Sequence, residues 1–128
     1  TENSPGGFTA YAPWLVAQAT DYLRGDVAVK GGITAVMKTA HLAEAFHMNY
    51  EIHHGGNSLN NIANLHATMA IKNTEYFEIL LPGEAQKCGL LEEAEPDANG
   101  IMHAIQEPGL GAKIDFGLIE RKKTAVLT

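Results

Sequence analysis

Two acid–base side chains stand at the ends of two successive strand-like segments, and this arrangement limits the fold more than any other feature. Asp26 ends the segment that begins at Tyr22, and His53 ends the segment that begins at Asn49. An amphipathic helix is expected between them, so the strands run parallel and their carboxyl ends meet at one edge of a sheet. A parallel β/α barrel builds its catalytic sites at that edge. The pattern therefore predicts a proton-transfer dyad and indicates a piece of an enzyme.

Helices and strand-like segments alternate along the chain as far as Pro82. The spacing of apolar residues predicts helices over 8–20, 34–47 and 58–72. Each is followed by a strand-like segment, over 22–26, 49–53 and 76–80. Thr34, which follows two glycines, is expected to cap the second helix. Beyond Pro82, turn sequences at 96–100 and 108–111 predict a mostly irregular tail that wraps back over the strands.

Length and composition set the class of protein. With 128 residues, the chain is far too short for an eight-stranded barrel of roughly 250 residues, so it is either a small α/β domain or a fragment. Apolar residues make up 45% and charged residues 19%, which is typical of a globular core, and neither a membrane span nor a signal peptide is expected. We therefore expect a cytoplasmic protein. A net charge of −6 argues against nucleic-acid binding, and the single Cys88 excludes an internal disulfide and a cysteine-based metal cluster.

After Asp26, a glycine turn and two further polar residues follow at defined spacings along the chain. Asp26 precedes a Gly-Gly-Ile-Thr turn at 31–34, an amphipathic helix leads from this turn to His53, and Glu78 follows 25 residues later. This succession resembles the mandelate racemase branch of the enolase superfamily, in which the Asp ends the sixth barrel strand, the histidine the seventh and a Glu the eighth. The spacing from histidine to Glu is most similar to that of acid-sugar dehydratases such as galactonate dehydratase. The tail segment 108–115 resembles the family's C-terminal return segment.

The resemblance implies that the chain is the C-terminal portion of a TIM-type (β/α) barrel, an α/β fold, from about strand 6 to strand 8. Residues 1–82 then form the partial barrel, from helix 5 to strand 8. Residues 83–128 form a segment that wraps back over the barrel toward a missing capping domain. The resemblance also implies a magnesium cofactor, and Glu2 falls where the family's fifth strand ends in a metal-binding Glu. The fragment thus holds one ligand of an incomplete magnesium site and is expected to be inactive alone.

The same resemblance assigns catalytic roles to three residues. In the family, magnesium holds an enediolate while a positioned base removes the proton next to a carboxylate. Asp26 is expected to hydrogen-bond the ring of His53 and so fix its tautomer, and His53 to transfer a proton as base or as acid. Glu78 is expected to hydrogen-bond the substrate from across the mouth of the barrel. The alternatives are a turn aspartate for Asp26 and a strand-end ion pair for Glu78.

Strand alternation separates the two neighbouring histidines. Asn49, Glu51 and His53 share one face, and the apolar residues that alternate with them should face the helices, so His53 is preferred as the catalytic histidine. His54 is expected to border the pocket and to take part in substrate binding. Lys30 is expected either to approach an anionic substrate or to be a solvated loop residue.

The function that the sequence predicts is removal of a proton next to a carboxylate, with loss of water from a sugar acid. The alternatives are a racemase or cycloisomerase of the same superfamily, or a non-catalytic small α/β binding domain. The expected partners are a small carboxylate substrate, the missing N-terminal part of the same enzyme and further copies of the chain in a homo-oligomer. Nucleic acid and membrane are not expected among them.

Overall fold

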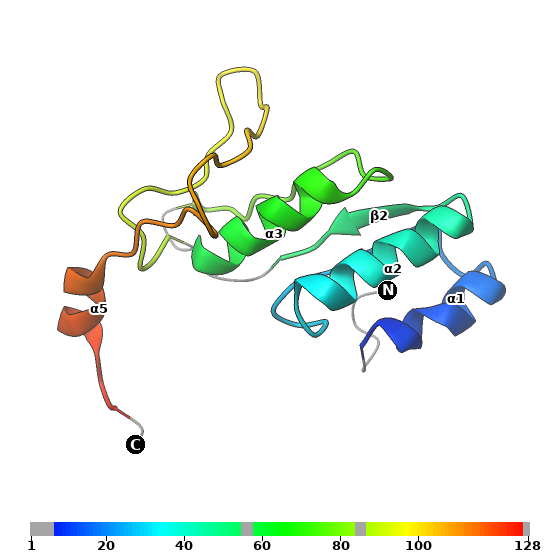
Figure 1. The fold of residues 1–128 in the computed structure, drawn as a ribbon, viewed down its shortest axis with the longest axis horizontal. Coiled ribbons are helices and arrows are strands. Elements are labelled where there is room, and N and C mark those ends of the chain that lie inside the picture. The colour runs from blue at the N-terminus through cyan, green and yellow to red at the C-terminus, as the bar shows by residue number, and fades with distance from the viewer. Residues whose placement is uncertain (1–6, 55–57, 84–86, 127–128) are drawn as a thin grey trace.

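The computed structural model describes residues 7–54, 58–83 and 87–126. Its elements, in chain order, are η1 (Phe8–Tyr11), α1 (Ala12–Val16), β1 (Tyr22–Gly25), α2 (Ile33–Ala45), β2 (Asn49–Ile52), α3 (Ser58–Ala70) and α5 (Phe116–Lys122). Figure 1 shows α2 and α3 side by side against β2, while α5 lies at the far end of the molecule. The two long helices therefore cover one face of the strands. None of the described helices combines the length and the apolar character needed to cross a bilayer.

β1 and β2 form a parallel pair, as the sequence predicted, and α2 connects them. The register places Gly25 opposite Ile52. The backbone N–H of His53 then donates to the carbonyl of Gly25 at 3.2 Å, which extends the contact past the last paired residues. Asp26 and His53 consequently stand at the same level of the two strands.

The face of the sheet that meets the helices is apolar. Leu23 on β1 and Tyr50 and Ile52 on β2 are buried on it. They pack in one cluster with residues from the surrounding helices, namely Tyr11, Leu15, Val36, Ala40, Ala43 and Ala67. Burial of apolar residues at this spacing removes one side of each helix from water. It stabilises the fold by about 25 cal/mol per Å² of apolar surface buried. The opposite face of the sheet stays open, and its side chains are polar or aromatic.

Two predictions about helix ends are wrong. The helix expected over 8–20 is η1 followed by α1, which ends at Val16, after which Gln18 takes a φ of 50°. Thr34 does not cap α2, because Gly32 occupies the N-cap position with a φ of 91°. Glycine adopts this left-handed conformation at little cost, so the backbone turn, rather than a side-chain cap, begins the helix.

The predicted strand over 76–80 forms no ladder with β2 within the described residues. Side chains hold this segment instead. The Glu51 carboxylate accepts hydrogen bonds from the Thr74 hydroxyl at 2.9 Å and from the backbone N–H groups of Glu75 and Tyr76 at 3.1 to 3.3 Å. Backbone donors that a parallel ladder would direct to strand carbonyls are thus bound to a carboxylate.

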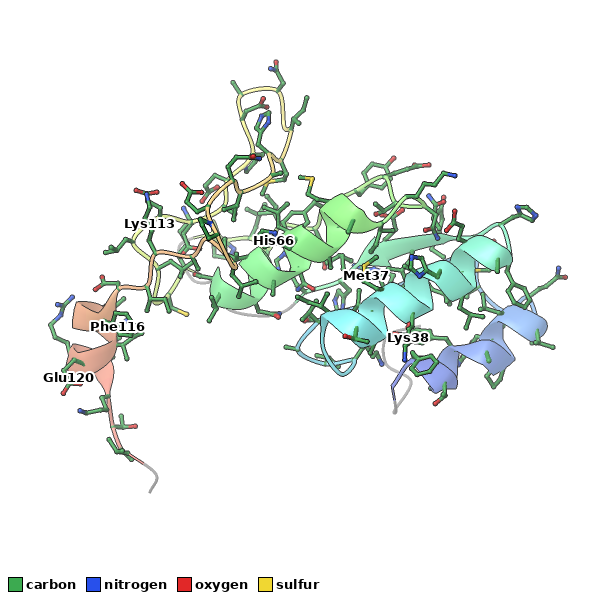
Figure 2. The ribbon with its side chains drawn as sticks, in the orientation of Figure 1. Met37, Lys38, His66, Lys113, Phe116 and Glu120 are labelled. Carbon is green, nitrogen blue, oxygen red and sulfur yellow. The ribbon has the colours of Figure 1, made fainter. Side chains whose placement is uncertain are left out.

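Polar contacts attach the tail after residue 87 to α3. The Ser58 hydroxyl donates to Glu93 and accepts the N–H of Cys88. The His66 ring, labelled in Figure 2, hydrogen-bonds to the Leu110 carbonyl at 3.0 Å. The tail is mostly irregular, as predicted, except for α5, which extends beyond this attachment (Figure 1).

Gly25 is a position on β1 where a side chain does not fit. A Cβ there would lie 2.3 Å from the Tyr50 hydroxyl and 2.9 Å from the Tyr11 hydroxyl, and both rings are buried. We expect Gly25→Ala to lower the free energy of unfolding by about 1–3 kcal/mol, the usual effect of overpacking a core, as measured by urea titration. Gly7→Ala is the control, because a Cβ at Gly7 meets only a backbone oxygen at 3.9 Å. Equal losses in the two variants would contradict this packing.

The tail loop drawn in yellow in Figure 1 is organised by Asp97. Its carboxylate accepts hydrogen bonds from the N–H groups of Ile101 and Asn99, at 2.9 and 2.8 Å, and from the His103 ring at 3.0 Å. The N–H of Ile101 and the His103 ring contribute most, and together these bonds lower the pKa of Asp97 to about 2.

Titration of the Asp97 carboxyl group by NMR should therefore give a midpoint near 2 rather than near the ordinary 3.8. Because the folded pKa is lowered, the carboxylate stabilises the loop fully above 3.8, and this contribution is lost as the pH falls through about 2. His103→Ala should move the midpoint upward, since it removes one donor. A midpoint at the ordinary value in the unsubstituted chain would show that the loop is not held in this way.

Candidate active site

The open face of the sheet carries a cluster of ionisable side chains near the carboxyl ends of β1 and β2. Arg24 lies on β1, His53 follows β2 directly, and Glu78 comes from the segment beside β2. Arg24 Nη2 donates to Glu78 Oε1 at 2.8 Å, and His53 Nε2 lies 3.8 Å from Glu78 Oε2. The three side chains are between 30% and 41% exposed, so solvent and small molecules reach them. The cluster brings together two of the predicted catalytic residues, His53 and Glu78.

Glu78 is held as a hydrogen-bond acceptor. Besides Arg24, the backbone N–H of His54 donates to Glu78 Oε2 at 3.0 Å. Partial burial alone would raise the pKa of Glu78, but the His54 N–H, the Arg24 guanidinium and the nearby His53 outweigh it and hold the pKa below its ordinary value. Glu78 therefore forms the ion pair that the sequence also allowed, and its negative charge lies next to His53.

Asp26 is buried after the end of β1, with 3% of its surface exposed. Its carboxylate accepts the backbone N–H of Ala28 at 2.7 Å, the Asn60 amide at 2.8 and 3.0 Å, and the Asn64 amide at 3.4 Å. Within the described residues these groups, rather than the His53 ring, are its hydrogen-bond partners. The predicted hydrogen bond between Asp26 and His53 is thus not formed, because α3 supplies the donors. A catalytic role for both residues stays a prediction.

The two predicted substrate-binding residues are both buried. His54 is 1% exposed on the helix-facing side of β2, and its ring centre lies 5.6 Å from that of Phe77. Lys30 is 3% exposed, with its Nζ 5.4 Å from the centre of the Tyr11 ring, so the alternative of a solvated lysine is wrong. Substrate binding by His54 or Lys30 stays a prediction.

A hollow of about 390 Å³ lies on the open face of the sheet. The residues that line it are Tyr22, Arg24, Glu51, Ile52, Tyr76 and Glu78, and their side chains are charged or aromatic except for that of Ile52, which faces the helices. A hollow of this size with a few charged groups suits a small polar molecule. The sequence-based prediction gives no role to Arg24, Glu51 or Tyr76. Strand alternation, which separates His53 from His54, is the signal that places Arg24 and Glu51 on this face.

The described part of the chain contains no group of three or more His, Cys, Asp or Glu side chains arranged to hold a metal ion. Glu2, the metal ligand that the resemblance implies, lies outside the described residues. The residues at hand therefore do not make up the magnesium site expected from the sequence.

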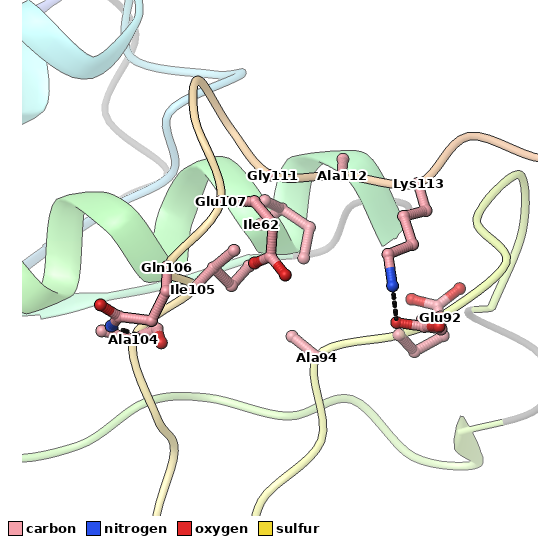
Figure 3. Close-up of a pocket in the computed structure, with 11 residues that line it drawn as sticks. Ile62, Glu92, Ala94, Ala104, Ile105, Gln106, Glu107, Gly111, Ala112 and Lys113 are labelled. Atoms are coloured by element: carbon pink, nitrogen blue, oxygen red, sulfur yellow. Dashed lines mark hydrogen bonds and ion pairs between the residues drawn. The ribbon is translucent and has the colours of Figure 1, made fainter.

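A second hollow, of about 260 Å³, lies between α3 and the tail (Figure 3). Ile62 and Ile105 contribute its apolar lining, and Glu92 and Lys113 lie at its edge. The Lys113 ammonium donates to Glu92 at 2.8 Å, and this contact raises the pKa of Lys113. Both partners are at least half exposed, and ion pairs this open contribute little to stability. The second hollow shares no lining residue with the first one and is not part of the candidate site.

A family model described as "Enolase C-terminal domain-like" matches residues 2–117. Two curated relatives have dehydratase names. A D-galactonate dehydratase family member from Paenibacillus sp. (strain JDR-2) is 34% identical over 100 residues, which cover 77% of this chain and 24% of that protein. D-mannonate dehydratase from Sphingomonas sp. (strain SKA58) is 32% identical over 107 residues, which cover 79% of this chain and 25% of that protein. The chain thus spans about a quarter of the length of these relatives.

Solved structures agree with this match. The crystal structure of D-glucarate dehydratase from Agrobacterium tumefaciens, complexed with magnesium, has a TM-score of 0.80 at 37% sequence identity. The similarity covers 94% of this chain and 32% of the dehydratase. The arrangement of helices and strands described above is therefore found within a longer solved protein.

Arg24→Met tests the electrostatic part of the candidate site. It removes the guanidinium that pairs with Glu78 and keeps a long side chain, so we expect the pKa of Glu78 to rise, as measured by NMR titration of its carboxyl group. The lowered pKa gives stability that is present above the unfolded pKa and lost on acidification through the folded pKa. The variant should therefore show a shallower loss of stability in acid.

Lys113→Met is the matched control, because it removes a cation from an ion pair outside the cluster. It should leave the Glu78 titration unchanged. If Arg24→Met also leaves it unchanged, the Arg24 contact does not set the ionisation of Glu78.

Proposed function

The chain belongs to the enolase C-terminal domain-like family, an α/β fold of the TIM-barrel type, and on this premise we propose that it is the C-terminal part of a sugar-acid dehydratase. In the proposed reaction a proton leaves the carbon next to the carboxylate. The hydroxyl group on the neighbouring carbon takes up a proton and leaves as water, and the resulting enol becomes a 2-keto acid. The names of the matched galactonate, mannonate and glucarate dehydratases support this reaction.

One observation carries the proposal. The parallel pairing of β1 and β2 sets Asp26 and His53 at one level, and Glu78 lies beside His53 on the open face. Parallel strands that end at one edge bring residues far apart in sequence to a shared surface, as in the active sites of β/α barrels. An acid–base residue and a carboxylate at that edge are the groups that proton transfer requires.

We assign the proton transfer to His53. Its side chain is 37% exposed, so a substrate on the open face can reach it. As an acid, the imidazolium gives its proton to the leaving hydroxyl group. As a base, the neutral ring takes the proton from carbon. The Glu78 carboxylate lies 3.8 Å from Nε2, and Glu78 stays the residue predicted to hydrogen-bond the substrate.

Asp26 is assigned to orient the His53 ring. Asn60 and Asn64 hold its carboxylate in the structure, and the Asn64 contact, at 3.4 Å, is the longest. A hydrogen bond to the ring would replace that contact and keep the shorter ones. Such a bond would fix the ring tautomer and stabilise the imidazolium.

Magnesium is included in the proposal because of the family to which the chain belongs, and not because of a site in the described residues. The D-glucarate dehydratase similar to this chain is complexed with magnesium, and a bound ion would stabilise the negative charge of an enediolate. Glu2 stays the predicted ligand. Because the described residues do not form the site, no step above depends on the ion.

The proposed partners follow from the same premise. The matched relatives extend well beyond this chain, so the N-terminal part of the same enzyme is the proposed partner of the open sheet face. A small carboxylate substrate and further copies of the chain complete the set. A cytoplasmic location stays a prediction from the sequence.

The experiment assays the full-length protein that contains this chain against a panel of sugar acids, with detection of 2-keto-3-deoxy products. We expect turnover of at least one acid. His53→Asn should lower kcat by about 10²–10⁴-fold, the range for loss of a general acid or base. Lys113→Met, outside the cluster, is the control and should keep full activity.

Two other results would change the assignment. Exchange of the proton next to the carboxylate with solvent deuterium, with no loss of water, would identify a racemase or a cycloisomerase instead. An unchanged kcat in His53→Asn would remove the histidine from the mechanism. Absence of both turnover and exchange would favour a non-catalytic domain.

A further inference from the structure

A small cavity, here named the His54 cavity, lies on the buried side of β2. It has a volume of about 80 Å³, and His54, Asn61, Phe77 and Lys87 are among its lining residues. Two of its polar atoms, His54 Nδ1 and Asn61 Oδ1, are buried and have no hydrogen-bond partner among the described residues. Buried polar atoms are nearly always satisfied, by protein or by ordered water. The His54 cavity therefore calls for a ligand that can satisfy both atoms.

The hydrogen-bond pattern around His54 defines the chemistry of that ligand. The ring Nε2 contacts the backbone carbonyl of Glu78. A carbonyl oxygen only accepts, so Nε2 must carry the hydrogen. In the neutral ring Nδ1 is then a lone-pair acceptor, and Asn61 Oδ1 is an acceptor as well. The ligand must donate two hydrogen bonds and must fit into the cavity.

We propose that the His54 cavity holds a water molecule that donates one hydrogen bond to His54 Nδ1 and one to Asn61 Oδ1. Water is the smallest ligand with two donor hydrogens. The cavity exceeds the roughly 10–15 Å³ of probe-sized space that one water needs. The water fixes the ring in the tautomer that donates to Glu78.

Lys87 is a further donor at this cavity. Its Nζ lies 2.8 Å from a carboxylate oxygen of Glu95, and its side chain is 38% exposed. The ammonium is thus drawn toward the tail carboxylate. Donation from Lys87 to His54 is the competing arrangement, and the experiment below separates the two.

The water site gives His54 a positioning role for Glu78. The backbone N–H of His54 holds the Glu78 carboxylate at 3.0 Å, and its ring holds the Glu78 carbonyl. In the opposite tautomer the Nε2 lone pair would face that carbonyl oxygen, and the contact would become repulsive. The effect of these two contacts on the reaction rests on the proposed function of Glu78. The presence of the water in the cavity does not depend on that function.

The test is NMR of the 128-residue chain with isotope-labelled histidine. Correlations from the ring protons to the ring nitrogens identify the nitrogen that carries the hydrogen, and cross-relaxation with water identifies a bound molecule. We expect the hydrogen of His54 on Nε2, a hydrogen-bonded Nδ1 and a water contact. Asn61→Leu replaces the amide by apolar atoms of similar size and removes the second acceptor, so the water contact should vanish and the Nδ1 resonance should move to that of a nitrogen without a hydrogen bond.

Two controls sharpen this result. Asn99→Leu makes the same chemical change on an exposed tail residue and should leave His54 unchanged. Lys87→Met should also leave it unchanged. A shift of the Nδ1 resonance in Lys87→Met, a hydrogen on Nδ1, or no water contact in the unsubstituted chain would each overturn the proposal. The last two outcomes need no variant, so a failure of Asn61→Leu to fold leaves the proposal testable.

Activity of the full-length protein provides a separate measurement. There Asn61→Leu should lower kcat by up to about 10²-fold, the effect of a misplaced catalytic group, and leave KM nearly constant. A protein without dehydratase activity would count against the proposed function, and the ring nitrogens of His54 would still decide the water site. A normal kcat in a variant that has lost the water contact would refute the positioning role.

Discussion

The parallel register of β1 and β2 decides which side chains share the open face. Because side chains alternate along each strand, Arg24, Glu51 and His53 lie on that face, whereas Tyr50 and His54 lie against the helices. A slip of one residue in β2 would exchange the positions of the two histidines and bury His53. The apolar cluster under the strands resists such a slip. Packing on one side of the sheet thus specifies the chemistry on the other.

Three carboxylates lie close to the strand ends, and each is satisfied by a different part of the chain. Amides from α3 and a turn N–H hold Asp26, the segment after Asn73 supplies most of the donors to Glu51, and Arg24 and His54 hold Glu78. Removing a carboxylate from water costs free energy unless hydrogen-bond donors replace the water. These contacts therefore fix the position of each carboxylate. Of the three, Glu78 is the one whose charge lies beside the predicted catalytic histidine.

Local signals in the sequence account for what could be predicted. Apolar alternation and the glycine turn before α2 are short-range patterns, and they identify both strands, their parallel order and the sides of His53 and His54. The partners of Asp26 could not be predicted, because Asn60 and Asn64 lie 34 and 38 residues away and their amides act through tertiary packing. The segment 76–80 has the alternation of a strand, but no local pattern shows that Glu51 competes for its backbone donors.

Because Glu51 binds backbone donors at the start of the segment beside β2, side chains rather than a ladder attach this segment. A stretch of backbone attached by side chains can open locally, because detaching it breaks none of the bonds that join the two strands. Proteins open such regions at free energies well below that of global unfolding. Glu78 would leave Arg24 and His53 together with its segment while the core stays folded, so amide protons there should exchange with solvent faster than those of β2.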